Sequence, residues 1–225
     1  DARLLSKKPS NLSMVEAATL PLVGITAWNA LIDRAQVRAG QKVLVHASCG
    51  GVGQVGLQLA KAFGAEVHAT ASGDRKIGLG FELGADRMIN YKQTGVDSYV
   101  RDETDGKGYV AVFDTVGGKC LDDSFQAARI GGCVVSIATR STHDLTPVHV
   151  KSLSLHVVFM LLPILRDEGR ERHGEILGEL TNLVEGGKVR PLVHEEVFDF
   201  QEVGRAHEAL ESGKATGKVA LRANW

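Results

Sequence analysis

The sequence predicts an α/β protein: a doubly wound, six-stranded parallel sheet (a Rossmann fold) with flanking remnants of a second domain. First, short β-type runs alternate with helical runs of about ten residues, a pattern that folds into parallel βαβ units. Second, a glycine-rich turn, Ser48–Gly53, ends the first of these strands and opens a helix. Third, 26 of the 225 residues are glycine, a share above the usual ~7% that suits many tight turns between strands and helices.

The central part of the chain contains the six expected strands and the helices that connect them. In the first helix, apolar residues recur at spacings of three and four, and Gly64 follows where a helix-ending glycine is common. Strands are expected at Lys42–His46, Glu66–Ala71, Arg87–Ile89, Val110–Asp114, Cys133–Ala138 and Leu155–Met160. Helices are expected at Val52–Phe63, Asp74–Leu83, Ser98–Thr104 and Leu121–Ala128.

Segments on both sides of this sheet are expected to be helical or mixed. Ser13 and Glu16 form a predicted capping box for a helix from residue 14. Pro21 and Gly24 are expected to end that helix before a second one at Thr26–Arg34. Three predicted domains result: a leading helical segment (1–33), a nucleotide-binding domain (34–165) and C-terminal helices and strands (166–225). In the last part we expect a helix at Arg170–Glu185, a strand at Val193–Phe200, a helix at Val203–Ser212 and a strand at Val219–Arg222.

The glycine-rich turn carries the clearest functional signal. Glycines at a strand-to-helix turn let backbone N–H groups approach a diphosphate, and the helix N-terminus adds about half a positive charge. The pattern therefore predicts a dinucleotide site. Ser48 stands where the usual G-x-G-x-x-G begins with glycine. The alternative interpretation is a strand–turn–helix packing motif without a ligand.

The end of the second strand favours NADP over NAD. NAD-binding units place an acidic residue there, about 20 residues after the glycines, to bind the ribose 2′-hydroxyl. Here Ala71 occupies that place, and Ser72, Arg75 and Lys76 follow. Two cations in the first turn of a helix are unfavourable by ~0.3–1 kcal/mol each, and a bound 2′-phosphate would remove that penalty. Asp74 opposes this interpretation, and an ordinary solvated helix start is the alternative.

Composition excludes several other classes of protein. The net charge is −1 and aromatic residues make up 5%, so neither nucleic acid nor an anionic membrane is an expected partner. Three widely spaced cysteines, without a C-x-x-C pair, suggest neither a zinc ribbon nor a disulfide framework. No apolar run reaches the ~20 residues that cross a bilayer. A reducing, cytoplasmic location is expected.

Longer runs of the sequence point to one family. They are LPLVGITAWNAL, VRAGQKVLVHASCGGVGQVGLQLAKAFGAEV, ELGADRMINY, GKGYVAVFDTVGG, GGCVVSIA and ATGKVAL. With these runs the chain resembles the medium-chain dehydrogenase/reductase superfamily, and within it the quinone oxidoreductase branch. The resemblance implies a nicotinamide-dependent reductase. Together with the residues after the second strand, it predicts an oxidoreductase that transfers hydride from NADPH to a quinone, an enone or another activated carbonyl.

The resemblance also implies the cofactor-binding residues. Ser48, Gly50, Gly51, Val52 and Gly53 would bind the diphosphate, and Thr26 would lie near the diphosphate or the nicotinamide. The 2′-phosphate would be held by Ser72, Lys76 and Tyr91, with Arg75 as a helper. The groove for the cofactor would be lined by Val116, Ile137, Phe159 and Met160, with Lys218 nearby.

Three further expectations follow from the resemblance. A GroES-like catalytic domain precedes the corresponding segment in the family, so the catalytic residues are expected outside this chain. Zinc-dependent members place a Cys ligand where this chain has Leu22, so we expect no zinc. The family pairs its sixth strand in a homodimer, and Leu155–Met160 is an apolar candidate for that edge. Alternatives are a zinc-type alcohol dehydrogenase and a nucleotide-binding module without turnover.

Several other residues have competing interpretations. Cys49 lies near a helix N-terminus, which lowers a thiol pKa, although a small packing residue is the simpler interpretation. Asp114 is expected to organise the turn into the following glycines. Of the eight histidines, His46 and His156 are expected in the core, and His173 and His207 in solvent.

Overall fold

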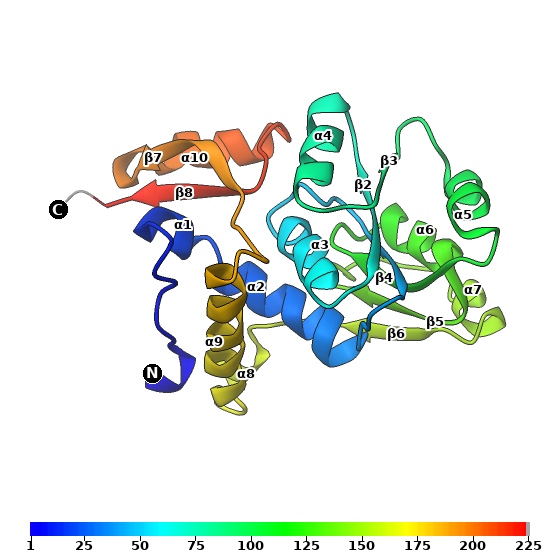
Figure 1. Ribbon diagram of the computed structural model, residues 1–225, viewed down its shortest axis with the longest axis horizontal. Coiled ribbons are helices and arrows are strands. Elements are labelled where there is room, and N and C mark those ends of the chain that lie inside the picture. The colour runs from blue at the N-terminus through cyan, green and yellow to red at the C-terminus, as the bar shows by residue number, and fades with distance from the viewer. Residues whose placement is uncertain (224–225) are drawn as a thin grey trace.

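The computed structural model describes residues 1–223 and confirms the predicted parallel sheet (Figure 1). Six strands pair in the order β3-β2-β1-β4-β5-β6, all of them parallel. This order is that of a Rossmann fold. The strands are β1 (Lys42–Val45), β2 (Glu66–Ala71), β3 (Arg87–Asn90), β4 (Tyr109–Asp114), β5 (Ala128–Ser136) and β6 (Ser154–Val157).

Strand β1 shows why both faces of the sheet are covered. Val43 and Val45 point into one hydrophobic core and Leu44 into the other, and all three are 0% exposed. The same alternation recurs in β4, where Phe113 joins the first core and Val112 the second. Continuous apolar strands of this kind require helices on both faces.

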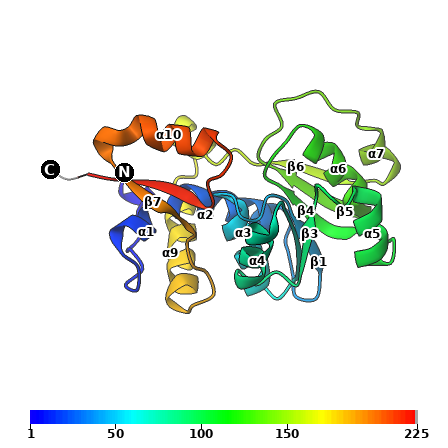
Figure 2. The same ribbon diagram turned by 90° about the horizontal axis from the view of Figure 1, so that it is seen from above.

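Helices cover the two faces as a doubly wound sheet requires (Figures 1 and 2). The first face packs against α3 (Gly53–Ala62), α4 (Asp74–Glu82) and the π-helix η2 (Asn29–Arg34). The second face packs against α5 (Val96–Thr104) and α6 (Lys119–Ala127), and the short α7 (Thr146–Val150) adjoins α6.

The leading segment differs from the prediction at Gly24. The capping box of Ser13 and Glu16 is confirmed and opens α1 (Met14–Ala18), but α2 (Pro21–Trp28) continues through Gly24. The predicted break there is wrong because α2 packs on α3 and α9 with Gly24 buried, and tertiary packing overrides the low helix propensity of glycine. A Cβ at this position would lie 2.5 Å from Leu180 Cδ1.

Several other predicted ends of helices and strands differ from those in the structure. The fourth helix begins at Lys119 rather than Leu121, and β5 begins at Ala128 rather than Cys133. Strand β6 ends at Val157, so Phe159 and Met160 follow the sheet instead of belonging to it. Helix α4 is confirmed despite two interior glycines, one of which, Gly80, lets the Met88 sulfur of β3 approach to 2.3 Å from a would-be Cβ.

The C-terminal part forms a second, smaller unit next to the sheet (Figure 1). Helix α8 (Leu162–Arg166) leads into α9 (Glu171–Glu185), which packs on α2. Strands β7 (Val193–Asp199) and β8 (Lys218–Arg222) form a separate parallel pair joined by η3 (Phe200–Glu202) and α10 (Val203–Glu211). His173 of α9 is 2% exposed, so its expected solvent exposure is wrong. It lies on the same helix face as Ile176 and Leu180, which are buried in the first core.

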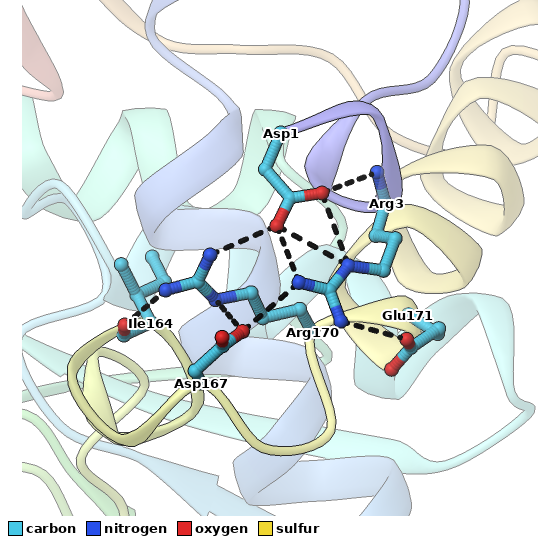
Figure 3. A network of polar contacts seen from close by, with 6 residues as sticks. All are labelled: Asp1, Arg3, Ile164, Asp167, Arg170 and Glu171. Atoms are coloured by element: carbon cyan, nitrogen blue, oxygen red, sulfur yellow. Dashed lines mark hydrogen bonds and ion pairs between the residues drawn. The ribbon is translucent and has the colours of Figure 1, made fainter.

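An exposed network of ions orients the first residues (Figure 3). The Asp1 carboxylate accepts hydrogen bonds from Arg3 at 2.7 Å and from Arg170 at 2.8 Å. Arg3 of η1 (Ala2–Leu4) also pairs with Asp167 at 2.9 Å and Glu171 at 3.2 Å. Ion pairs in solvent contribute ~0–1 kcal/mol each, so this network orients the segment against α9 more than it stabilises the fold.

No helix among residues 1–223 is long and apolar enough to span a membrane.

One buried glutamine joins the small unit to the sheet. Gln58 of α3, 4% exposed, donates its amide N–H to the Arg190 carbonyl, and its Oε1 accepts from the Arg190 N–H, both at 2.9 Å. The neighbouring Gln54, 0% exposed, accepts from the Leu192 N–H at 3.3 Å. The side-chain amides of Gln58 and Gln54 therefore hold the segment before β7 to α3, and we call these contacts the Gln58 clamp.

We expect Gln58→Ala to lower the free energy of unfolding by ~2–4 kcal/mol. The substitution removes two hydrogen bonds to Arg190 and two from Nε2 to Gln54, and it leaves two partly buried backbone groups of Arg190 unpaired, at ~1–3 kcal/mol each. Urea unfolding measures the change. The exposed Gln201→Ala is the control and should change stability by less than ~0.5 kcal/mol. Equal stability of the two variants would show that the clamp is unimportant.

Candidate functional site

The candidate site lies at the carboxyl edge of the sheet, between β1 and β4. These neighbours are the point where the strand order reverses, from β1-β2-β3 on one side to β4-β5-β6 on the other. Crevices at such switch points are where open α/β sheets bind ligands. The turn Ser48–Gly53 follows β1 at this place.

The turn is a tight structure that needs at least one of its glycines. Ser48 is 0% exposed and donates its N–H and its hydroxyl to the Thr70 carbonyl, at 3.1 and 3.3 Å. Gly50 donates to the Ala47 carbonyl at 2.9 Å. A Cβ at Gly53 would lie 2.3 Å from that same carbonyl oxygen. Packing therefore explains why residue 53 is glycine. It does not explain the unpaired N–H groups of the turn.

Free backbone donors distinguish this turn from a packing motif. Within residues 1–223, the N–H groups of Gly51, Val52 and Gly53 make no hydrogen bond, while Gln54 already donates to the Gly50 carbonyl. Gly51 and Val52 are partly exposed. Unpaired N–H groups at the start of a ten-residue helix create a site for an anion.

The residues expected near a 2′-phosphate gather beside the end of β2. The N–H of Tyr91 donates to the Ala71 carbonyl at 3.3 Å, which fixes Tyr91 next to the Ser72 segment. Lys76 is partly buried and its Nζ reaches the Gly213 carbonyl at 3.4 Å. Arg75 forms an ion pair with Glu195 of β7, in which both side chains are about 70% exposed. The side chains of Lys76 and Arg75 thus both contact the C-terminal unit.

Three of the four residues expected in the cofactor groove line one pocket. Val116, Ile137 and Phe159 lie at the ends of β4, β5 and β6 around a cavity of about 680 Å³. Met160 does not join them: it is 9% exposed and packs in the first hydrophobic core. Further lining residues that sequence reasoning missed are Gly118, Ala138, Thr139, Arg140, Ser141, Val157 and Val158. These residues lie at or just after the ends of β4, β5 and β6, and this position in the sequence could have identified them as lining residues.

Asp114 organises the turn that leads into Gly117 and Gly118, as the sequence predicted. Its carboxylate accepts from the N–H groups of Val116 and Gly117 at 3.0 Å each and from the Ser136 hydroxyl at 2.6 Å. Gly117 has φ +79°, and a Cβ there would lie 2.1 Å from the Ala138 carbonyl oxygen. With its oxygens used in this way, Asp114 is a structural carboxylate.

The two outlying predicted residues have different positions. Thr26 is 5% exposed and its hydroxyl donates to the Leu22 carbonyl within α2 at 2.7 Å, so it is not among the residues lining the pocket. Lys218 lies against the glycine turn, because a Cβ at Gly51 would be 2.8 Å from Lys218 Cδ. The preceding Gly217 fixes this approach by donating to the Cys49 carbonyl at 2.8 Å. Sequence reasoning missed Gly217.

Cys49 is a packing residue rather than a reactive thiol. Its side chain is 3% exposed and its Sγ donates to the Lys76 carbonyl at 3.0 Å. Burial raises the pKa of the Cys49 thiol, although a hydrogen bond to Ser48 and the charge of Lys76 oppose the shift. The simpler interpretation of Cys49 as a packing residue therefore agrees with its burial and its raised pKa, and the alternative of a reactive thiol is not supported.

Comparisons with known proteins show the family to which the chain belongs. The family described as zinc-binding dehydrogenase matches residues 83–221. The chain belongs to the zinc-binding dehydrogenases. They form part of the medium-chain dehydrogenase/reductase superfamily that the sequence resembles. Among the residues described, no three His, Cys, Asp or Glu side chains cluster as metal ligands would.

Solved relatives share the whole fold of the chain. An alcohol dehydrogenase superfamily protein from Novosphingobium aromaticivorans is 41% identical, with a TM-score of 0.94 over 98% of this chain and 67% of its own. The JamJ enoyl reductase is 28% identical, with a TM-score of 0.87 over 99% of this chain and 67% of its own. A quinone oxidoreductase of Pseudomonas syringae is 28% identical, with a TM-score of 0.86 over 98% and 68%.

Curated relatives are much longer than the chain. A highly reducing polyketide synthase of Aspergillus terreus is 32% identical over 220 residues, which are 95% of this chain and 8% of that protein. The chain thus spans about a tenth or less of such relatives.

The buried His46 beneath the turn gives a prediction about pH. It is 4% exposed, and burial lowers the pKa of its imidazole from 6.5 to about 4, although nearby Asp114 opposes the shift. Below pH 6.5 His46 is protonated in the unfolded chain, whereas in the folded chain it stays neutral until about pH 4. The free energy of unfolding therefore falls as the pH falls through this window. We expect His46→Gln to lose ~2 kcal/mol less stability than the wild type between pH 8 and pH 5.

Urea unfolding at the two pH values measures this difference. The exposed His207→Gln is the control and should keep the wild-type pH dependence. The same loss of stability in wild type and His46→Gln would contradict the assignment.

Proposed function

We propose that the chain binds NADPH at the carboxyl edge of its sheet and that the whole protein is a zinc-independent oxidoreductase. Its substrate would be a quinone, an enone or another activated carbonyl. The observation that carries the proposal is the row of unpaired N–H groups at Gly51–Gly53, directly at the topological switch point. The 680 Å³ pocket at the ends of β4–β6 opens beside it.

The diphosphate would be held by the backbone of the glycine turn. The free N–H groups of Gly51, Val52 and Gly53 would donate to its oxygens, and the start of α3 adds partial positive charge. The Lys218 side chain, packed against Gly51, would close this cradle from the C-terminal unit.

Preference for the phosphorylated cofactor rests on the residues after β2. The Arg75–Glu195 ion pair is exposed on both sides, so it contributes little and can be exchanged for a phosphate. Lys76 has only a long contact, 3.4 Å, with the Gly213 carbonyl. No acidic residue stands at the end of β2, where NAD-binding units have one.

The nicotinamide end would occupy the pocket lined by Val116, Ile137 and Phe159. When bound, NADPH supplies hydride, and the protein supplies orientation and exclusion of water. The apolar side chains around this pocket suit a flat ring. The enoyl reductase and quinone oxidoreductase relatives support an activated double bond or quinone as the acceptor.

Zinc independence rests on Leu22. This side chain, at the position of a cysteine ligand in zinc-dependent members, is an exposed alkyl group on α2. Because an alkyl group cannot ligate zinc, Leu22 supports the proposal of a zinc-independent reaction. The alternative of a zinc-type alcohol dehydrogenase would need ligands elsewhere in the whole protein.

A homodimer through β6 is the proposed assembly. Strand β6 is an edge of the sheet, and exposed apolar side chains follow it at Phe159, Leu161 and Leu162. Unpaired apolar edges are normally covered. A solution mass of one chain would contradict a dimer of this segment.

We propose a cytoplasmic location for the protein because all three of its cysteines are free.

A second candidate function is a nucleotide-binding module without turnover of its own. It would bind NADPH but leave it unoxidised in the presence of quinones and enones, which absorbance of the reduced nicotinamide reports. No binding of NADPH at all would contradict both candidates.

We expect Lys76→Ala to weaken NADPH binding by about tenfold and NADH binding by less than twofold. A hydrogen bond to a charged group contributes ~1.5–3 kcal/mol, and partial exposure reduces this value. Fluorescence titration of the chain with each nucleotide measures the effect. Lys92→Ala, an exposed residue after β3, is the matched control. Equal losses for both nucleotides would contradict a 2′-phosphate contact.

A further inference from the structure

The long loop between β5 and α7 (Figure 2) is joined to α6 by a chain of hydrogen bonds. The Ser141 hydroxyl lies 2.6 Å from Nε2 of His143. The Nδ1 of the same imidazole lies 2.7 Å from Oδ1 of Asp122 on α6. A hydroxyl, an imidazole and a carboxylate are thus connected in series.

The order of the atoms is that of a nucleophile, its base and an orienting acid. The carboxylate of Asp122 can only accept, so Nδ1 carries the proton, and Nε2 presents its lone pair to the Ser141 hydroxyl. A serine becomes nucleophilic when such a base takes its proton. The same arrangement recurs on unrelated folds and is recognised by geometry instead of by sequence order.

The imidazole is held in place, whereas the hydroxyl is accessible. The His143 side chain is 8% exposed and stands edge-on to the Phe125 ring, with centroids 6.2 Å apart. Asp122 comes from a regular helix, α6. Ser141 is exposed and lines the 680 Å³ pocket. The base is therefore fixed and the nucleophile faces the space that a substrate can enter.

The surroundings of Ser141 suit the acyl part of an ester. The pocket combines apolar side chains, Val157 and Phe159 among them, with the polar loop that contains Ser141. The backbone N–H of Thr142 makes no hydrogen bond within residues 1–223. In serine hydrolases of the α/β type, the N–H of the residue after the nucleophile stabilises the oxyanion.

We propose that Ser141, His143 and Asp122 form a second catalytic site, which hydrolyses short-chain carboxylic esters. The Ser141 Oγ bonds to the acyl carbon, its proton passes to Nε2 of His143, and the broken ester C–O bond releases an alcohol that takes this proton. Water then attacks the acyl carbon, gives its proton to the same nitrogen and frees a carboxylic acid, while Ser141 regains its proton. No oxidation or reduction occurs. Because Ser141 lines the pocket proposed for the nicotinamide, the hydrolysis is proposed for the protein without bound nucleotide.

Two measurements test the site. A fluorophosphonate probe should attach to Ser141, as peptide mass spectrometry shows, and p-nitrophenyl butyrate should release p-nitrophenol. We expect His143→Gln to slow both reactions by at least ~100-fold, the usual contribution of a general base. Asp122→Asn should slow them by about tenfold or more because the imidazole loses its orientation. Ser141→Ala should abolish both.

Controls separate chemistry from loss of structure. Ser98→Ala, on α5, removes a hydroxyl elsewhere and should keep the wild-type rates. Thermal unfolding of each variant shows whether it folds, and the three substitutions keep the proposal testable if one of them does not. Labelling of Ser141 that is no faster than labelling of Ser98, or that is unchanged in His143→Gln, would overturn the proposal. Loss of NADPH binding without loss of labelling would contradict only the reductase function.

Discussion

The close approach of the start of α3 to the end of β1 is the constraint on which the rest of the structure depends. Only a glycine at position 53 allows it, since any Cβ would meet the Ala47 carbonyl oxygen at 2.3 Å. This approach brings α3 against the first core and leaves the N–H groups of residues 51–53 without partners among residues 1–223. The packing of α3 and the proposed site for a diphosphate therefore depend on one backbone geometry.

The C-terminal unit completes the same region from the other side. The Gln58 clamp fixes the segment before β7, and the Gly217 N–H bonds the Cys49 carbonyl of the turn. As a result, Lys218 packs on Gly51 and Glu195 reaches Arg75. Residues more than 100 positions apart in the chain meet around one turn. A change in the small unit is thus expected to affect the affinity of the turn for its ligand.

Sequence reasoning identified the elements better than their ends. The alternation of strands and helices predicted all six strands of the sheet, because buried parallel strands are continuous apolar runs. It failed at Gly24 and His173 because both are explained by contacts between α2, α9 and the core, which no local pattern reveals. For Cys49, the sequence left two interpretations open, and its burial in the folded protein decided for packing.

The sequence by itself determined the fold, the position of the glycine turn and the absence of an acidic residue after β2. These are local properties of adjacent residues. Only the tertiary structure decided which distant residues surround the turn, that Val116, Ile137 and Phe159 share a pocket while Met160 does not, and that Ser141, His143 and Asp122 meet. The physical reason is that sheet order and helix packing, rather than spacing along the chain, set the distances between these side chains.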